Sequence, residues 1–164
     1  MDTVLIKNWN EIVDPNDKVY HLGDFAWKTV GYWERIREQL NGHIHLIMGN
    51  HDENFVTNPR VHKLFEEVTY QKRIWHGKHC IYLNHYPFLC FGGAWKGLDA
   101  VWQAFGHVHS NPRSDIGLDH QRLIHCFPTQ YDVGVDNNDF KPISIDELSD
   151  IIFNKQMSLG MYKK

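Results

Sequence analysis

The stretch Leu46-Ile47-Met48-Gly49-Asn50-His51-Asp52 decides how this chain is interpreted. An apolar strand runs into a glycine, and an amide, an imidazole and a carboxylate follow in consecutive positions. Side chains on a strand alternate between its two faces, so three consecutive polar groups cannot share one face. We therefore expect them on the loop just past the strand, where α/β sheets commonly build their sites. Gly49 allows the backbone to turn sharply there.

Composition bounds the class of protein. With 164 residues and 42% hydrophobic content, residues 1–164 are expected to form a single domain. The 17 basic and 20 acidic residues are mixed along the chain, and the net charge of -3 favours neither nucleic acid nor a membrane as partner. The chain opens without a signal peptide, and no apolar run approaches the roughly 18 residues of a membrane span. The prediction is a cytoplasmic protein.

Three more segments repeat the pattern of a strand followed by metal-binding residue types. They are Gly23-Asp24 after residues 18–22, Asn84-His85 after residues 78–83, and Gly106-His107-Val108-His109 after residues 100–105. The chain holds 12 histidines, and histidine is the commonest metal ligand. A mixed set of carboxylate, amide and imidazole ligands suits manganese, iron or zinc.

Helices are expected between these strands. Apolar residues recur at helical spacing over residues 2–13 and 29–40, and a capping box at Ser144 and Glu147 opens a last helix. Residues 67–75 and 78–83 are expected to form a hairpin around His76-Gly77, with further strands over 122–127 and 130–135. Alternating helices and strands favour an α/β layered fold with parallel strands. The tryptophans at 27, 33, 75, 95 and 102 are expected in the core, with Trp95 the alternative candidate for a substrate wall.

These blocks resemble the calcineurin-like metallophosphoesterases, in particular the small prokaryotic and phage-type members. The signature of that family is D-x-H, G-D, G-N-H-D/E, a histidine after a strand, and G-H-x-H. The last four blocks occur here in order between residues 23 and 109. The resemblance implies two β-sheets flanked by helices, an α-β-β-α arrangement, with a two-metal site at the strand ends.

The resemblance also implies a metal ligand set. Asp24 would bridge two ions, Asn50, His85 and His107 would complete one of them, and His109 would help hold the other. Manganese is the first expectation, with iron or zinc as alternatives. A metal-activated water would then attack the phosphorus atom of a phosphomonoester or phosphodiester.

The same resemblance implies roles for the last two residues of the opening stretch. His51 would act as general acid for the leaving group or stabilise developing charge. A positioned histidine of this kind contributes on the order of 10²–10⁴-fold to the rate. Asp52 would orient His51 by accepting its other ring proton.

One block of the family signature is missing. No D-x-H stands upstream of Gly23, and His21, His43 and His45 are poor substitutes because they are expected within or before strands. Either the chain is a shortened version of a longer protein that lacks the first strand, or it is a variant with one complete metal site. We therefore expect one well-formed ion and an incomplete second site. An exposed sheet edge would also invite a homodimer.

The prediction from the sequence is thus a metal-dependent phosphoesterase acting on a small phosphoester or a nucleotide. Two rivals stay open. The first is a metal-binding or scaffolding protein of the same fold that has lost catalysis. The second is a nuclease, for which Lys72, Arg73 and Lys78 would supply a local basic groove.

Overall fold

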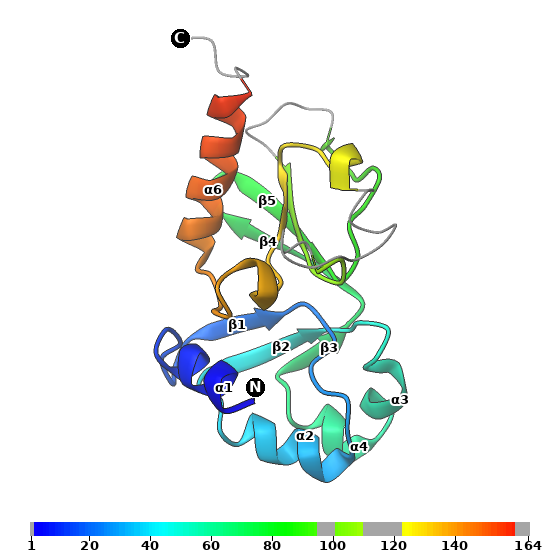
Figure 1. Ribbon diagram of the computed structural model, residues 1–164. Coiled ribbons are helices and arrows are strands. Elements are labelled where there is room, and N and C mark those ends of the chain that lie inside the picture. Colours follow the sequence, from blue (N-terminus) through cyan, green and yellow to red (C-terminus); the bar gives the residue numbers. More distant parts are fainter. Residues whose placement is uncertain (1, 95–100, 110–122, 160–164) are drawn as a thin grey trace.

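Two β-sheets lie next to each other in the computed structural model, which describes residues 2–94, 101–109 and 123–159 (Figure 1). Helices and strands alternate along the first half of the chain, as the sequence predicts for an α/β protein. The helices are α1 (Asp2–Asn10), α2 (Val30–Arg37), α3 (Glu53–Val56), α4 (Pro59–His62) and α6 (Ile145–Ser158), with short 3-10 turns η2 (Leu123–His125) and η3 (Val135–Asn137). The strands are β1 (Lys18–His21), β2 (His43–Ile47), β3 (Glu67–Thr69), β4 (Gln71–His76), β5 (His79–Asn84), β6 (Val101–Phe105) and β7 (Gln130–Asp132).

The first sheet is parallel and has the order β1-β2-β3. Ile44 and Leu46 are two residues apart on β2 and share one face, which helices α1, α2 and α4 cover. Trp9, Trp33 and Val61 of these helices pack with them in a core where Trp33 is completely buried. The apolar spacing thus predicts Trp9 and Trp33 on the buried faces correctly, whereas Val4 and Ile12 of the same pattern are 55% and 43% exposed.

The second sheet has the order β4-β5-β6-β7. β4 and β5 are antiparallel and joined through Gly77 and Lys78, with Gly77 in the left-handed region at φ 55°. The pairs β5–β6 and β6–β7 are parallel. Helix α6 begins with the predicted capping box, in which the Ser144 hydroxyl accepts from the Glu147 N–H at 3.1 Å.

The two sheets and α6 share a second core. Ile47 of β2 packs in it with Ile81 and Trp102 of the second sheet and with Leu148 and Ile152 of α6. Because β1 and β2 are parallel, and β5 and β6 are parallel, each pair brings its carboxyl ends to one edge of its sheet. All four predicted ligand segments follow these four strands, and the shared core holds the two edges together.

Two of the predicted strands are wrong. Residues 67–75 do not form one strand, because the chain changes sheets at Tyr70: β3 pairs in the first sheet and β4 in the second. Within 122–127, residues 123–125 form η2 instead of a strand. The ladder beside β6 is already occupied by β7, so this segment has no strand partner there and leaves the Ile124 side chain 80% exposed.

The tryptophans divide between core and surface. Trp33 and Trp102 are buried as expected, whereas Trp27 and Trp75 are 62% and 71% exposed and so lie outside the core. Trp95 lies outside the described residues. Within the described part of the chain, no helix combines the length and the apolar character needed to cross a bilayer.

Candidate metal centre

The loops after β1 and β2 pack directly against each other. A Cβ atom at Gly49 would lie 2.7 Å from the Asp24 backbone nitrogen and 2.8 Å from His85 Cε1. A Cβ atom at Gly23 would lie 2.6 Å from His85 Nδ1, and Gly23 also has φ 93°. Both positions therefore require glycine, because any side chain would push the ligand-bearing loops apart.

Asp52 fastens these two loops together. Its carboxylate is fully buried and accepts hydrogen bonds from the backbone N–H groups of Asp24 (2.7 Å), Phe25 (2.9 Å) and Gly49 (2.9 Å). Burial raises the pKa of this carboxyl group, the three backbone donors lower it, and the charge of Asp24 raises it; the net shift is upward. Asp52 thus braces the loops that carry Asp24 and Asn50.

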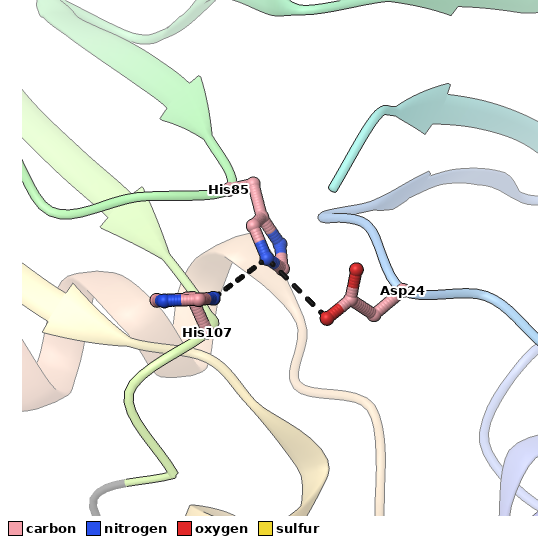
Figure 2. A group of neighbouring side chains, drawn as sticks. All are labelled: Asp24, His85 and His107. Atoms are coloured by element: carbon pink, nitrogen blue, oxygen red, sulfur yellow. Dashed lines mark hydrogen bonds and ion pairs between the residues drawn. The ribbon is translucent and has the colours of Figure 1, made fainter. Parts of the chain in front are cut away.

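Asp24, His85 and His107 bring three ligand atoms together at the strand ends (Figure 2). These atoms all lie within 4.8 Å of one another. His85 Nε2 is 3.1 Å from His107 Nδ1 and 3.5 Å from Asp24 Oδ2, and Asn50 Oδ1 is 3.2 Å from the same His85 nitrogen. Four of the five predicted metal ligands therefore converge on one place, and they come from four separate strand ends.

The ring orientation of His85 suits metal binding. His85 is only 2% exposed, and its Nδ1 lies 2.7 Å from the carbonyl oxygen of Leu22, which can only accept. Nδ1 therefore carries the proton, and in the neutral ring Nε2 presents a lone pair. That lone pair faces Asn50 Oδ1 at 3.2 Å, Asp24 Oδ2 at 3.5 Å and His107 Nδ1 at 3.1 Å. A divalent cation fits this donor set of carboxylate, amide and imidazole.

Several of the ligand residues have a strained backbone. Asp24, His107 and His109 have φ values of 55°, 68° and 47°, a left-handed conformation that non-glycine residues rarely adopt. Strain of this kind concentrates at functional sites, because the surrounding structure must hold it in place. In the described residues only Asp139 and Phe140 share this conformation among the non-glycines.

His109 is set apart from the other predicted ligands. Its Nδ1 lies 3.1 Å from Asp136 Oδ2, next to the short turn η3, and it is not part of the cluster of Asp24, His85 and His107. Its side chain is 54% exposed, in contrast to the buried His85. A ligating histidine commonly gives its other ring N–H to a carboxylate. Asp136 would thus orient the ring of His109, as the carboxylate partner of a ligating histidine does.

His51 lies at the exposed rim of the centre. Its backbone N–H donates to Asp24 Oδ1 at 3.0 Å, which leaves Asp24 Oδ2 directed at His85. Its ring packs against that of Trp27, with ring centroids 3.7 Å apart and the two planes tilted by 32°. The expected hydrogen bond from His51 to Asp52 is not among the contacts of the described residues, and both Asp52 oxygens accept from backbone N–H groups instead. Trp27 rather than Asp52 holds the imidazole.

Sequence reasoning missed three neighbours of the centre. The sequence predicts Trp27 in the core and gives no role in the centre to Tyr86 or Asp136. The Tyr86 hydroxyl donates to Asn50 Oδ1 at 3.3 Å, and burial and the charges of Asp24 and Glu53 raise the pKa of this phenol, which favours the donor form. The available signal was adjacency in sequence: Trp27 follows Asp24 by three residues, and Tyr86 follows His85 directly.

Comparison with known proteins gives relatives without an assigned function. No protein-family model matches the chain. The uncharacterized protein MJ1445 of Methanocaldococcus jannaschii is 32% identical over 154 residues, which cover 93% of this chain and 75% of MJ1445. The chain belongs to the MJ1445 family.

A solved structure is similar to this member of the MJ1445 family. The protein of unknown function AQ665 from Aquifex aeolicus aligns with a TM-score of 0.64 and 27% sequence identity. The alignment covers 92% of this chain and 84% of AQ665. The structural similarity to AQ665 therefore extends over nearly the whole of the chain.

Proposed function

We propose that this protein is a metal-dependent phosphoesterase of the calcineurin-like class, and that its two sheets are the layered sandwich of that class. The observation that carries the proposal is the convergence of Asp24, Asn50, His85 and His107, a set of carboxylate, amide and imidazole groups that suits a divalent cation. The order of these residues along the chain matches the family blocks, which a chance cluster has no reason to do.

The ligand residues would hold a divalent cation, with manganese the first expectation. Such an ion acts as a Lewis acid toward a phosphoryl oxygen and lowers the pKa of a bound water. Asn50 is a neutral ligand, so it adds no charge that would repel an anionic substrate. Tyr86 donates to Asn50 Oδ1 and restrains that amide.

His51 is the residue that would donate a proton to the leaving group. It adjoins Asn50 in sequence, its backbone N–H holds Asp24, and its ring stands exposed at the rim, where a leaving group would depart. A histidine within reach of the leaving oxygen donates a proton to it as the ester bond breaks. Packing against Trp27 limits the rotation of the ring, so the donor is positioned before the substrate arrives.

The nuclease alternative gains little support. The expected basic groove includes Lys72, but its ammonium group forms an ion pair with Glu67, which also accepts from His45. Arg73 lies over the ring of Tyr82 at 5.8 Å. The ion pair offsets the positive charge of Lys72 toward a nucleic acid backbone, whereas Arg73 keeps its charge beside the neutral Tyr82 ring.

The test is hydrolysis of bis(p-nitrophenyl) phosphate by metal-free protein, with and without added manganese. Turnover is expected only with the metal, and Asp24→Asn and His51→Ala are expected to lower it at least 100-fold. His62→Ala is the matched control, because His62 is exposed on α4 and is expected to leave the rate unchanged. Metal-independent turnover, or rates that neither substitution changes, would contradict the proposed enzymatic activity. Manganese binding without turnover would favour the scaffold rival.

A further inference from the structure

Trp27 is an exposed tryptophan that contacts the proposed proton donor His51. A large aromatic side chain is 62% exposed, yet one region of its ring packs against His51. Isolated exposed hydrophobic residues are ordinary on protein surfaces. This one differs because it touches the proposed proton donor, so a substrate leaving group at His51 would also meet the indole.

The surface next to Trp27 is hollowed. A shallow hollow of about 630 Å³ is lined by Lys28, Thr29, Gly31, Tyr32, Arg35 and Phe55. It begins one residue after Trp27, and Phe55 belongs to α3, which follows His51 and Asp52 directly. The hollow is thus lined by residues that are close in sequence to Trp27 and to the loop that carries His51.

The hollow carries positive charge. Lys28 Nζ lies 4.5 Å and the Arg35 guanidinium carbon 5.0 Å from the centre of the Tyr32 ring. The Tyr32 hydroxyl donates to the carboxylate of Asp2, so an acid also lies nearby. The two cations favour an anionic ligand, while the aromatic rings and Phe55 favour a flat apolar one.

We propose that Trp27 is a specificity-determining residue that stacks on an aromatic base carried by the leaving group, which makes the substrate a small nucleotide. This inference rests on the proposed phosphoesterase function. Among phosphoesters, nucleotides are the common class that joins a flat aromatic ring to a phosphoryl group. With the phosphoryl group at the metal ligands and the leaving oxygen at His51, the base extends over Trp27 toward the hollow. Base stacking on an aromatic side chain is sequence-tolerant, so the proposal names the class of base-bearing leaving group rather than one base.

The test compares two ligands that share a leaving alkoxide. Adenosine 5′-monophosphate and ribose 5-phosphate differ only in the base, and their binding to manganese-loaded protein is measured by calorimetry. The nucleotide is expected to bind between about 5-fold and 150-fold more tightly, the range that base stacking contributes. Trp27→Ala is expected to abolish the difference and Trp27→Phe to retain most of it. Trp75→Ala, which removes another exposed indole, is expected to change nothing.

Hydrolysis of the same two ligands separates a specificity role from a purely structural one. If Trp27→Ala raises KM for the nucleotide alone, the stacking role is supported. Because Trp27 also holds His51, kcat is expected to fall for both ligands. If KM for the nucleotide stays unchanged in Trp27→Ala while kcat falls equally for both ligands, Trp27 only positions His51 and the proposal is wrong. A preference for the nucleotide that survives in Trp27→Ala would also overturn it, as would an oligonucleotide that binds 100-fold more tightly than the mononucleotide. Binding with the expected preference but no hydrolysis would support stacking of the base on Trp27 and would contradict the proposed function, so the nucleotide would be a ligand and not a substrate.

Discussion

The carboxylate of Asp52 accepts a hydrogen bond from the backbone N–H of Asp24 at 2.7 Å, so the last residue of one ligand loop fixes the other. Asp52→Asn keeps the size of the side chain but turns one acceptor oxygen into a donor. At least one of the three backbone N–H groups then loses its partner, which is expected to cost about 1–3 kcal/mol of stability. This loss of stability is measured by urea denaturation of the metal-free protein.

Asp150→Asn is the control for that measurement, because Asp150 is exposed on α6. It is expected to change the free energy of unfolding by less than about 0.5 kcal/mol. If Asp52→Asn were as stable as the control and lost only turnover, Asp52 would act through His51 after all.

Because the two ligand loops approach each other closely, a substitution of Gly49 is expected to lower the affinity for manganese. Gly49→Ala places a methyl group 2.7 Å from the Asp24 nitrogen and 2.8 Å from His85 Cε1, so we expect manganese affinity to fall at least 10-fold. Calorimetric titration with manganese measures this change. Gly31→Ala is the matched substitution, since a Cβ there meets nothing within 4 Å and alanine favours helix α2. Equal manganese affinity in both variants would contradict the described packing.

A buried histidine predicts a pH-dependent stability. Burial, with a smaller contribution from neighbouring His85, lowers the pKa of His21 from 6.5 to about 4, against the opposing charge of Asp24. Its Nδ1 is buried without a hydrogen-bond partner among the described residues. Between pH 6.5 and about 4 the unfolded chain binds a proton that the folded chain does not. Stability is therefore full above pH 6.5 and falls with pH through this window, by up to about 3 kcal/mol.

His21→Phe isolates that contribution. The ring already packs edge-on against Phe25, with centroids 5.2 Å apart, so phenylalanine suits the position. The free energy of unfolding of metal-free protein is measured in urea at pH 7 and pH 4.5. The loss between these pH values is expected to shrink by about 2 kcal/mol in the variant. A loss equal to that of the wild type would show that His21 is not the titrating group.

Two buried glutamines hold the segment that follows His85. Gln103 Oε1 accepts from the Phe88 N–H at 2.9 Å, its Nε2 donates to the Tyr86 carbonyl at 2.9 Å, and Gln130 Nε2 donates to Gln103 Oε1. Methionine has a similar shape, but Gln103→Met leaves these partners without their hydrogen bonds. Each lost bond is expected to cost about 1–3 kcal/mol of stability. We expect a loss of at least 2 kcal/mol in urea denaturation, whereas Gln71→Met on the exposed face of β4 is near neutral. A Gln103→Met protein as stable as the wild type would show that this network adds no stability.

The sequence predicted the strand ends well because their signal is local. A short apolar run followed by glycine and a polar residue indicates both the strand and its end. Parallel pairing then brings Asp24 next to Asn50 in one sheet and His85 next to His107 in the other, and the core shared by the sheets joins the two pairs. The α/β class and the capped last helix follow from equally local patterns.

The errors arise where contacts between residues far apart in the sequence determine the local structure. Trp27 packs against His51, which lies 24 positions away in the sequence. Nothing in the residues around Trp27 distinguishes this exposed tryptophan from the buried Trp33. Asp52 was expected behind His51, but three backbone donors from two loops compete for its oxygens. The strand expected over 122–127 fails because β7 takes its place beside β6.

Manganese binding tests the central claim most directly. Calorimetry of metal-free protein is expected to give one ion per chain for the wild type and for His109→Ala, because His109 lies outside the cluster. His85→Ala is expected to lose this binding, since it removes the nitrogen on which Asp24, Asn50 and His107 converge. Unchanged manganese binding by His85→Ala would contradict the assignment of this centre.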